Sequence, residues 1–183
     1  MTTIIILAIL AGIAVFAIGI FNRIVTLENR FENAWSQIDV QLKRRGDLIP
    51  NLVETVQGYA SHEKEVFEQV ARSRQAMLSA GSVPESAEAA NMMTAALGRL
   101  LALSESYPDL KANENFRVLQ EELAGIESKI AYARQFYNDA VLQYNNAIET
   151  IPGVLLAGPM NKKEQVFLEI PETERQAPQV SFS

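Results

Sequence analysis

The 183-residue sequence contains no cysteine and only one histidine, His62. The absence of cysteine excludes disulfides, thiolate metal ligands and cysteine nucleophiles. The segment HEKEV begins like the zinc-protease motif HExxH, but Val66 occupies the position that a second histidine would need on the same helix face. A di-iron bundle would need Glu-x-x-His pairs, and Tyr59 stands three residues before the histidine. Since there is also no Gly-rich phosphate loop or nucleophile elbow, we expect no catalytic residue, no metal, no cofactor and no enzymatic activity.

Positive charge is also scarce. The chain has 16 Lys and Arg residues against 22 Asp and Glu, which gives a formal net charge of -6. A protein that binds nucleic acid usually presents a basic field, so we expect no nucleic-acid partner. The hydrophobic fraction of 48% is ample for a core, and the length suits one domain with accessory segments.

The first twenty residues carry no charged side chain at all. The segment TTIIILAILAGIAVFAIGIF runs from Thr2 to Phe21, and about 20 apolar residues are enough to cross a hydrocarbon core of roughly 30 Å. A cleaved signal peptide would need a basic region before the apolar run and a small-x-small cleavage site after it. Neither is present, so we expect residues 1–21 to form a transmembrane anchor in the lipid bilayer.

The orientation of this anchor follows from the basic residues beside it. No Lys or Arg precedes the apolar run, whereas Arg23 and Arg30 follow it. Basic residues near a membrane helix stay on the cytoplasmic side. We therefore expect a single-pass protein of the cell (inner) membrane, with its N-terminus outside and its helical part in the cytoplasm.

Beyond the anchor, apolar residues recur at steps of three and four, which is typical of amphipathic helices. The spacing predicts four helices, at about 22–45, 48–79, 83–104 and 109–151. Helices joined by short corners favour an all-α fold, in which the single N-terminal transmembrane helix is followed by an elongated antiparallel four-helix bundle over residues 22–151. Residues 152–183 are expected to form an apolar cap segment and a mobile polar tail.

The segment LKRRGDLIPNLV, residues 42–53, is expected to be the first corner of the bundle. Its basic residues 43–45 would lie in the last turn of a helix, where cations complement the negative helix end. Gly46 would take the left-handed cap conformation. Asp47 would then cap the next helix, with Pro50 in its first turn.

The later corners contain recognisable capping residues. Ser82 followed by Glu85 is a capping box, so a helix should begin directly after Ser82. Asn113 is a plausible N-cap, since the apolar periodicity of the last helix starts at Phe116.

Two long blocks of the chain closely resemble the LemA family of bacterial membrane proteins. They are NRIVTLENRFENAWSQIDVQLKRRGDLIPNLVETVQGYASHEKEVFEQV and YPDLKANENFRVLQEELAGIESKIAYARQFYNDAVLQYN. The resemblance extends from the apolar run to PQVSF near the C-terminus. It implies a short N-terminal segment outside the cell, one membrane helix and a long helical bundle in the cytoplasm. It implies no established activity.

Two classes of function remain. Amphipathic helices without catalytic motifs favour a membrane-anchored, self-associating helical scaffold with no catalytic activity of its own. The alternative is an adaptor or substrate-like regulator of a membrane protease or envelope stress system, which would act through its bundle or its C-terminal tail. In either case we expect a membrane-protein partner.

Self-association is predicted from the unequal helix lengths. At 1.5 Å per residue the first helix, 22–45, would be about 36 Å long, the second about 45 Å from residue 48 to residue 77, and the fourth about 60 Å. The longest would then keep an apolar stripe that its shorter neighbours leave uncovered, and such stripes tend to become interfaces. We therefore expect a homo-oligomer, with these contact residues: Tyr137, Val141, Tyr144 and Ile148. The competing expectation is a monomer whose tail and IPGVLLAGPM segment fold back over the stripe.

Two features of the sequence allow two interpretations each. The apolar residues Val154, Leu155 and Leu156 follow the last helix, and they either touch the bilayer or pack at the base of the bundle. Glu63 lies on an otherwise apolar helix stripe. It is either at the bundle edge in water or partly buried and paired with an arginine such as Arg134.

Overall fold

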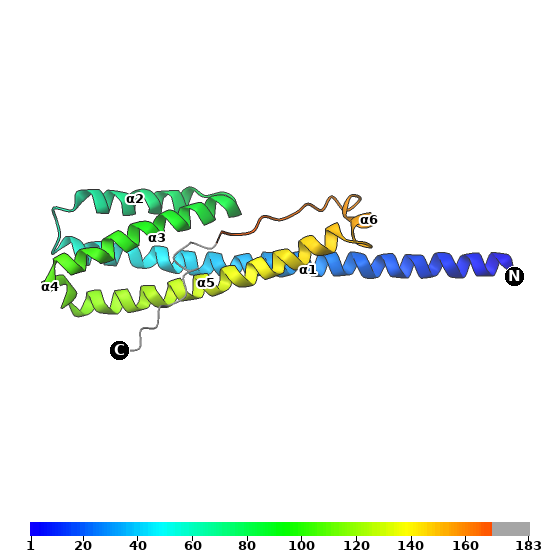
Figure 1. The fold of residues 1–183 in the computed structure, drawn as a ribbon, viewed down its shortest axis with the longest axis horizontal. Helices are drawn as coiled ribbons and strands as arrows, with labels where there is room; N and C mark the ends of the chain where they lie inside the picture. The colour runs from blue at the N-terminus through cyan, green and yellow to red at the C-terminus, as the bar shows by residue number, and fades with distance from the viewer. Residues whose placement is uncertain (170–183) are drawn as a thin grey trace, which may run out of the picture. The chain divides into compact units, whose positions relative to one another are not determined.

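The computed structural model describes residues 1–169 and is all-helical, with no strand in that range. The all-α prediction is therefore confirmed. Within these residues, six helices follow one another (Figure 1): α1 Thr2–Gln57, α2 Lys64–Ser79, α3 Val83–Ser106, α4 Pro108–Lys111, α5 Glu114–Glu149 and α6 Val154–Ala157.

The described residues form two compact units. Unit 1 consists of Met1–Ser36 and Gln135–Phe167, and unit 2 of Gln37–Arg134 together with Leu168 and Glu169. The long helices α1 and α5 each contribute to both units.

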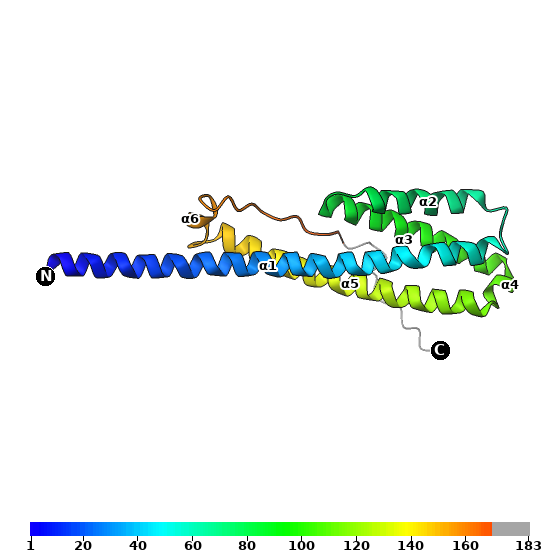
Figure 2. The same cartoon turned by 180° about the vertical axis from the view of Figure 1, so that it is seen from behind.

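Unit 2 is held together by one hydrophobic core. Apolar side chains spaced three or four residues apart turn towards each other from α1, α2, α3 and α5. Helices α2 and α3 lie side by side and run in opposite directions in both views (Figures 1 and 2). The buried core residues include Ile49, Leu52, Val56, Val70, Met93, Leu97, Leu100, Phe116 and Leu123. Burial of this shared apolar surface is the main stabilising term for these helices, because most of the stability of a helix in a protein comes from packing of its apolar face and not from helix propensity.

Unit 1 pairs the part of α1 that carries Phe31 and Trp35 with the C-terminal part of α5, and the two lie beside each other in both views (Figures 1 and 2). Phe31 of α1 packs edge-on against Tyr144 of α5, with ring centroids 4.9 Å apart. Trp35 makes a similar contact with Tyr137 at 6.1 Å. Such aromatic pairs contribute about 0.5–1.5 kcal/mol each beyond their buried area.

The predicted corner at residues 42–53 is wrong. Helix α1 continues through Gly46 and Pro50 to Gln57, and the chain turns only between Gln57 and Lys64. No glycine among the described residues has a positive φ, so the left-handed cap is not formed. A proline inside a helix costs about 3 kcal/mol. The side chains of Ile49, Leu52 and Val56 are buried in the continuous helix, and burial of each contributes roughly 1.5–3 kcal/mol to stability. Together these contributions outweigh the cost of the proline.

Gly46→Ala is therefore expected to stabilise the protein by about 0.5–1 kcal/mol, because alanine is the better helix former. A Cβ at this position would meet nothing within 4 Å. The shift can be measured by thermal unfolding followed by circular dichroism. A loss of stability would show that this position needs glycine and that the helix is interrupted there.

The other helix starts agree with the predicted caps. The Ser82 hydroxyl accepts a hydrogen bond from the Glu85 N–H at 3.4 Å, and α3 begins at the next residue. The Glu85 carboxylate accepts from the Gly81 N–H at 2.8 Å, one residue before the usual capping-box partner. The Asn113 side chain accepts from the Phe116 N–H at 2.9 Å at the start of α5. The predicted helix over 109–151 is thus divided into α4 and α5 at this cap.

Candidate functional site

The N-terminal part of α1 presents an apolar surface that nothing in the described chain covers. Its most apolar stretch has a mean hydropathy of 3.1 and is 0% buried. The large side chains from Ile4 to Phe16 are exposed, and Phe21 at the end of the run is exposed as well. By length and composition α1 is able to cross a membrane, and it is the one such helix among residues 1–169.

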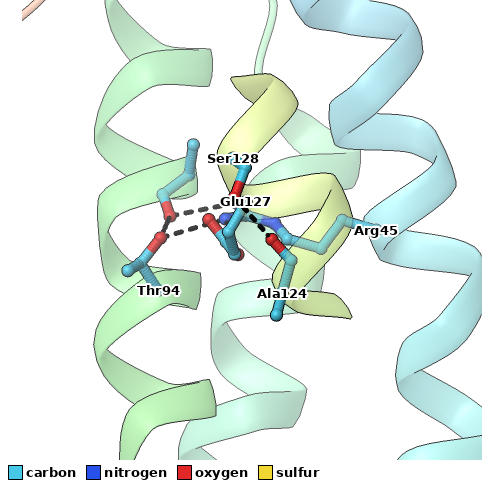
Figure 3. Close-up of polar contacts among 6 residues, drawn as sticks. Arg45, Thr94, Ala124, Glu127 and Ser128 are labelled. Atoms are coloured by element: carbon cyan, nitrogen blue, oxygen red, sulfur yellow. Dashed lines mark hydrogen bonds and ion pairs between the residues drawn. The ribbon is translucent and has the colours of Figure 1, made fainter. Parts of the chain in front are cut away.

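Arg45 is the most unusual residue of unit 2, because its side chain is completely buried. Its guanidinium donates from Nη1 to the Glu127 carboxylate at 2.8 Å and to the Thr94 hydroxyl at 2.9 Å. Nη2 donates to the Ala90 carbonyl at 3.0 Å. Figure 3 shows the side chain of Arg45 extending towards Thr94 and Glu127. One guanidinium therefore connects α1, α3 and α5 within unit 2.

Only one partner of the ion pair between Arg45 and Glu127 is fully buried, since the Glu127 side chain is 30% exposed. Burial of a charge is costly unless a partner and hydrogen bonds compensate it. Here the compensation is incomplete. Among the described residues, the buried Arg45 Nε has no hydrogen-bond partner, and neither do the buried Gln41 Oε1 and Asn91 Oδ1. The cluster ties three helices together at a local energetic cost.

This cluster was not predicted, because residues 43–45 were expected at a helix end. The available signal was the position of Arg45 in the series Leu42, Arg45, Ile49 and Leu52, whose steps of three and four continue the apolar stripe. Its neighbour Lys43 is exposed and pairs with Asp39. Only the third of the three basic residues therefore points into the core.

Glu63 fits neither of the two interpretations in full. Its side chain is half-buried, and it accepts a hydrogen bond from the Tyr107 hydroxyl at 3.1 Å rather than pairing with the suggested Arg134. This hydrogen bond to the carboxylate, together with partial desolvation, raises the pKa of the Tyr107 phenol. A second contact of the same kind lies nearby, where the Asn113 amide donates to the Tyr59 hydroxyl at 3.0 Å.

The predicted oligomer-contact residues lie inside unit 1 and not on an open face. All four are buried: Tyr137, Val141, Tyr144 and Ile148. Phe31 and Trp35 of α1 pack against the two tyrosines. Burial, with a smaller contribution from nearby carboxylates, raises the pKa of the Tyr144 phenol. The reasoning that left this stripe uncovered is therefore wrong, because α1 lies alongside the C-terminal half of α5.

The segment Lys162–Phe167, called the strap below, also packs onto unit 1. Asn145, a buried residue of α5, donates from its amide nitrogen to the Gln165 carbonyl and accepts from the Gln165 N–H, both at 2.9 Å. The Tyr137 hydroxyl donates to the Val166 carbonyl at 3.4 Å. One asparagine thus satisfies both backbone groups of a single strap residue.

A salt bridge holds the start of the strap. The Lys162 ammonium pairs with the Glu28 carboxylate of α1, and both side chains are mostly buried. The direction of the chain before it is set by Asn161, which has a φ of 52°. Asparagine tolerates this left-handed conformation better than most residues. The strap therefore folds back onto unit 1. The tail, to which the competing monomer expectation referred, lies outside the described residues from residue 170 onward.

The three predicted membrane-contacting residues differ in their surroundings. Leu155 is 70% exposed and Val154 is also exposed, whereas Leu156 is half-buried. Leu155 and Val154 therefore do not serve as a cap on unit 1.

Within the described residues, no group of three His, Asp or Glu side chains is placed to hold a metal ion. The features that stand out are an exposed apolar helix, a buried ion pair and a strapped helix pair. These arrangements can anchor the protein, position its helices and bind a partner.

The comparison with known proteins agrees with this description. Magnetosome protein MamQ of Magnetospirillum gryphiswaldense is 25% identical over 163 residues, which cover 75% of this chain and 60% of that protein. Magnetosome protein MamQ 2 of Paramagnetospirillum magneticum is 25% identical over 178 residues, or 82% of this chain and 65% of that protein. The chain therefore spans less than two thirds of these relatives' length. Protein LemA of Metamycoplasma hominis is 25% identical over 171 residues, or 88% of this chain and 78% of that protein. The sequence profile of the LemA family matches residues 34–182, and the chain belongs to the LemA family.

Proposed function

We propose that the protein is a membrane-anchored helical scaffold without catalytic activity of its own. One observation carries the proposal: the exposed apolar run of α1 continues, without any break in the helix, into the part of α1 that packs in unit 1. Such a helix both inserts into a bilayer and builds the folded part. The names of the relatives, MamQ and LemA, describe no enzymatic reaction, which supports the same class of function.

The architecture included in this proposal is an antiparallel four-helix bundle in unit 2. Its support is the core that α1, α2, α3 and α5 share, with the Arg45 cluster as a polar tie between three of them. A bundle of this kind offers long helix faces to a membrane-protein partner.

The membrane side of the scaffold includes the turn after α5. Val154 and Leu155 are exposed apolar residues, and exposed apolar side chains that are close together mark surfaces that bind a partner or a membrane. Leu156 lies behind them and is half-buried. We propose that the exposed pair contacts the bilayer surface.

We propose that the folded part lies in the cytoplasm, because Arg23 and Arg30 follow the apolar run and no basic side chain precedes it. We expect the variant Ser61→Cys, at an exposed residue between α1 and α2, to stay unlabelled by a membrane-impermeant maleimide in intact cells. It should be labelled after lysis. The natural chain has no cysteine, so the background is zero.

The matched control is Thr2→Cys, at the other end of the apolar run, which should be labelled in intact cells. If the two variants exchange their labelling behaviour, the folded part lies outside and the proposed orientation is wrong.

Self-association belongs to the proposal but requires a different surface from the one first predicted. Leu78 and Tyr132 of unit 2 are large, exposed apolar or aromatic side chains, and anchoring in a plane raises the effective concentration of any weak contact. We expect light scattering of the full-length protein in mild detergent, at micromolar concentration, to give a protein mass above that of one 20.3 kDa chain. The variant Leu78→Asp should lower that mass. A single chain in both cases would remove self-association from the proposal and leave the anchoring unaffected.

The alternative role, an adaptor or regulator of a membrane protease or envelope stress system, would use the bundle or the C-terminal tail. The tail, residues 170–183, lies outside the described residues.

A further inference from the structure

Unit 1 contains a cleft where the apolar run of α1 ends. The cleft lies between α1 and the C-terminal end of α5 and has a volume of about 250 Å³. Ile20, Arg23 and Ile24 line it from α1, Asn146 lines it from α5, and Thr150 lines it from the turn directly after α5. None of the residues that line it is acidic.

The position along α1 fixes the depth of this cleft relative to a bilayer. The apolar run ends at Phe21, and Arg23 follows two residues later, which is about 3 Å further along a helix that rises 1.5 Å per residue. The head-group layer on each side of a bilayer is roughly 5–8 Å thick. Arg23 therefore lies at the depth of lipid phosphates when the apolar run spans the hydrocarbon core.

The charge in the cleft is positive and uncompensated. Arg23 is the only charged residue among its lining residues. Its side chain is exposed, and within residues 1–169 it takes part in no ion pair. This is notable in a chain with a formal net charge of -6, which as a whole would be repelled by an anionic surface. An arginine guanidinium matches phosphate geometry with two parallel N–H donors.

Side-chain amides supply further donors beside this cation. The Asn146 side chain is exposed and makes no hydrogen bond to another group within residues 1–169, so its amide is available to donate. Gln143 accepts a hydrogen bond from Arg30 through its side-chain oxygen, so its amino group is free to donate. These neutral donors suit the phosphate and glycerol oxygens of a lipid head group.

The rim of the cleft is apolar and firmly positioned. Ile151 lines the cleft and is 82% exposed, so it is available to contact an acyl chain. The turn that carries it packs tightly against α5, because a Cβ on Gly153 would lie 1.8 Å from the Ala147 carbonyl oxygen. A larger residue cannot occupy position 153 without moving this rim.

We propose that this cleft binds the head group of an anionic phospholipid, with Arg23 holding the phosphate and with Asn146 and Gln143 donating to its oxygens. The inference rests on the proposed membrane anchoring, which supplies the lipid at the required depth. It goes beyond anchoring because it assigns a preference for negatively charged lipid to one cleft, not to the charge of the protein as a whole.

Native mass spectrometry of the full-length protein in mild detergent tests this binding. The protein is titrated with phosphatidylglycerol or with phosphatidylcholine, and the dissociation constant of the first lipid adduct is compared. Both lipids carry the phosphate, but the quaternary ammonium of phosphatidylcholine would be repelled by Arg23, so we expect phosphatidylglycerol to bind about tenfold more tightly. Arg23→Gln should bring the ratio close to one.

The matched control is Arg44→Gln, which removes the same charge from an exposed arginine of α1 in unit 2 and should keep the preference. Asn146→Leu removes a donor without changing the charge and should weaken phosphatidylglycerol binding severalfold. If Arg23→Gln does not fold, this variant tests whether the cleft binds the lipid. No preference in the natural protein, or equal losses in the Arg23 and Arg44 variants, would overturn the proposal.

Alkaline extraction of cell membranes separates this inference from the function on which it rests. If the protein stays in the membrane pellet but shows no lipid preference, only the lipid site is wrong. If the protein is extracted as a soluble species, the anchoring itself is wrong.

Discussion

Glu127→Ala is expected to lower the free energy of unfolding by about 3 kcal/mol, because it leaves the buried Arg45 guanidinium without a counter-charge. Loss of one partner of a buried ion pair typically costs about 3–5 kcal/mol. The lower end applies here, since the Glu127 side chain is 30% exposed and Arg45 keeps hydrogen bonds to Thr94 and Ala90. Urea unfolding of the full-length protein in mild detergent, followed by circular dichroism, measures the change.

The reverse substitution should behave differently. Arg45→Met replaces the buried cation by an apolar side chain of similar length and leaves Glu127 free to turn towards water. Replacement of a buried charge by a well-packed apolar residue is often neutral or stabilising, so we expect a change within about 1 kcal/mol. Glu121→Ala, an exposed change on the same helix, is the control and should have little effect. Equal losses of unfolding free energy in the Glu127 and Arg45 variants would contradict this account, in which only Arg45 is a fully buried charge and Glu127 can reach water.

Asn145→Leu is expected to release the strap from unit 1. The substitution removes both hydrogen bonds to Gln165, each worth on the order of 1 kcal/mol. Two such bonds correspond to roughly a 30-fold rise in the population of the open strap. Limited trypsin digestion, which cuts after Lys162 and Lys163, should therefore become at least tenfold faster at these two sites.

Two variants sharpen this test. Asn145→Asp keeps an acceptor for the Gln165 N–H but loses the donor to its carbonyl, so its cleavage rate should lie between those of the natural protein and Asn145→Leu. Glu149→Ala, an exposed change on the same helix, should leave the rate unchanged. If digestion is equally slow in all variants, Asn145 does not hold the strap closed.

The helices themselves were predictable because their apolar residues repeat at steps of three and four. This periodicity located α3 and the long helix α5, and the caps at Ser82 and Asn113 were found from local chemistry alone. Local chemistry failed at residues 42–53, where the glycine and the proline are common helix breakers. The apolar stripe on either side of them is buried, and burial decided in favour of a continuous helix.

The contacts that define the sites were less accessible to sequence reasoning. Arg45 meets Glu127 across 82 residues of chain, and Asn145 meets Gln165 across 20. No pattern in one sequence pairs such distant residues. The buried arginine could have been suspected from its place on the stripe, whereas an asparagine on α5 gives no sign that it binds a backbone segment.

The unbroken path of α1 from Thr2 into the packed part of unit 1 has a mechanical consequence. A bilayer that is thinner than the apolar run makes a membrane helix tilt. Since no loop or hinge separates the apolar run from Phe31 and Trp35, a tilt of the one carries the other with it. In the proposed membrane-anchored state, α1 would therefore act as a lever that converts membrane thickness into an inclination of unit 1.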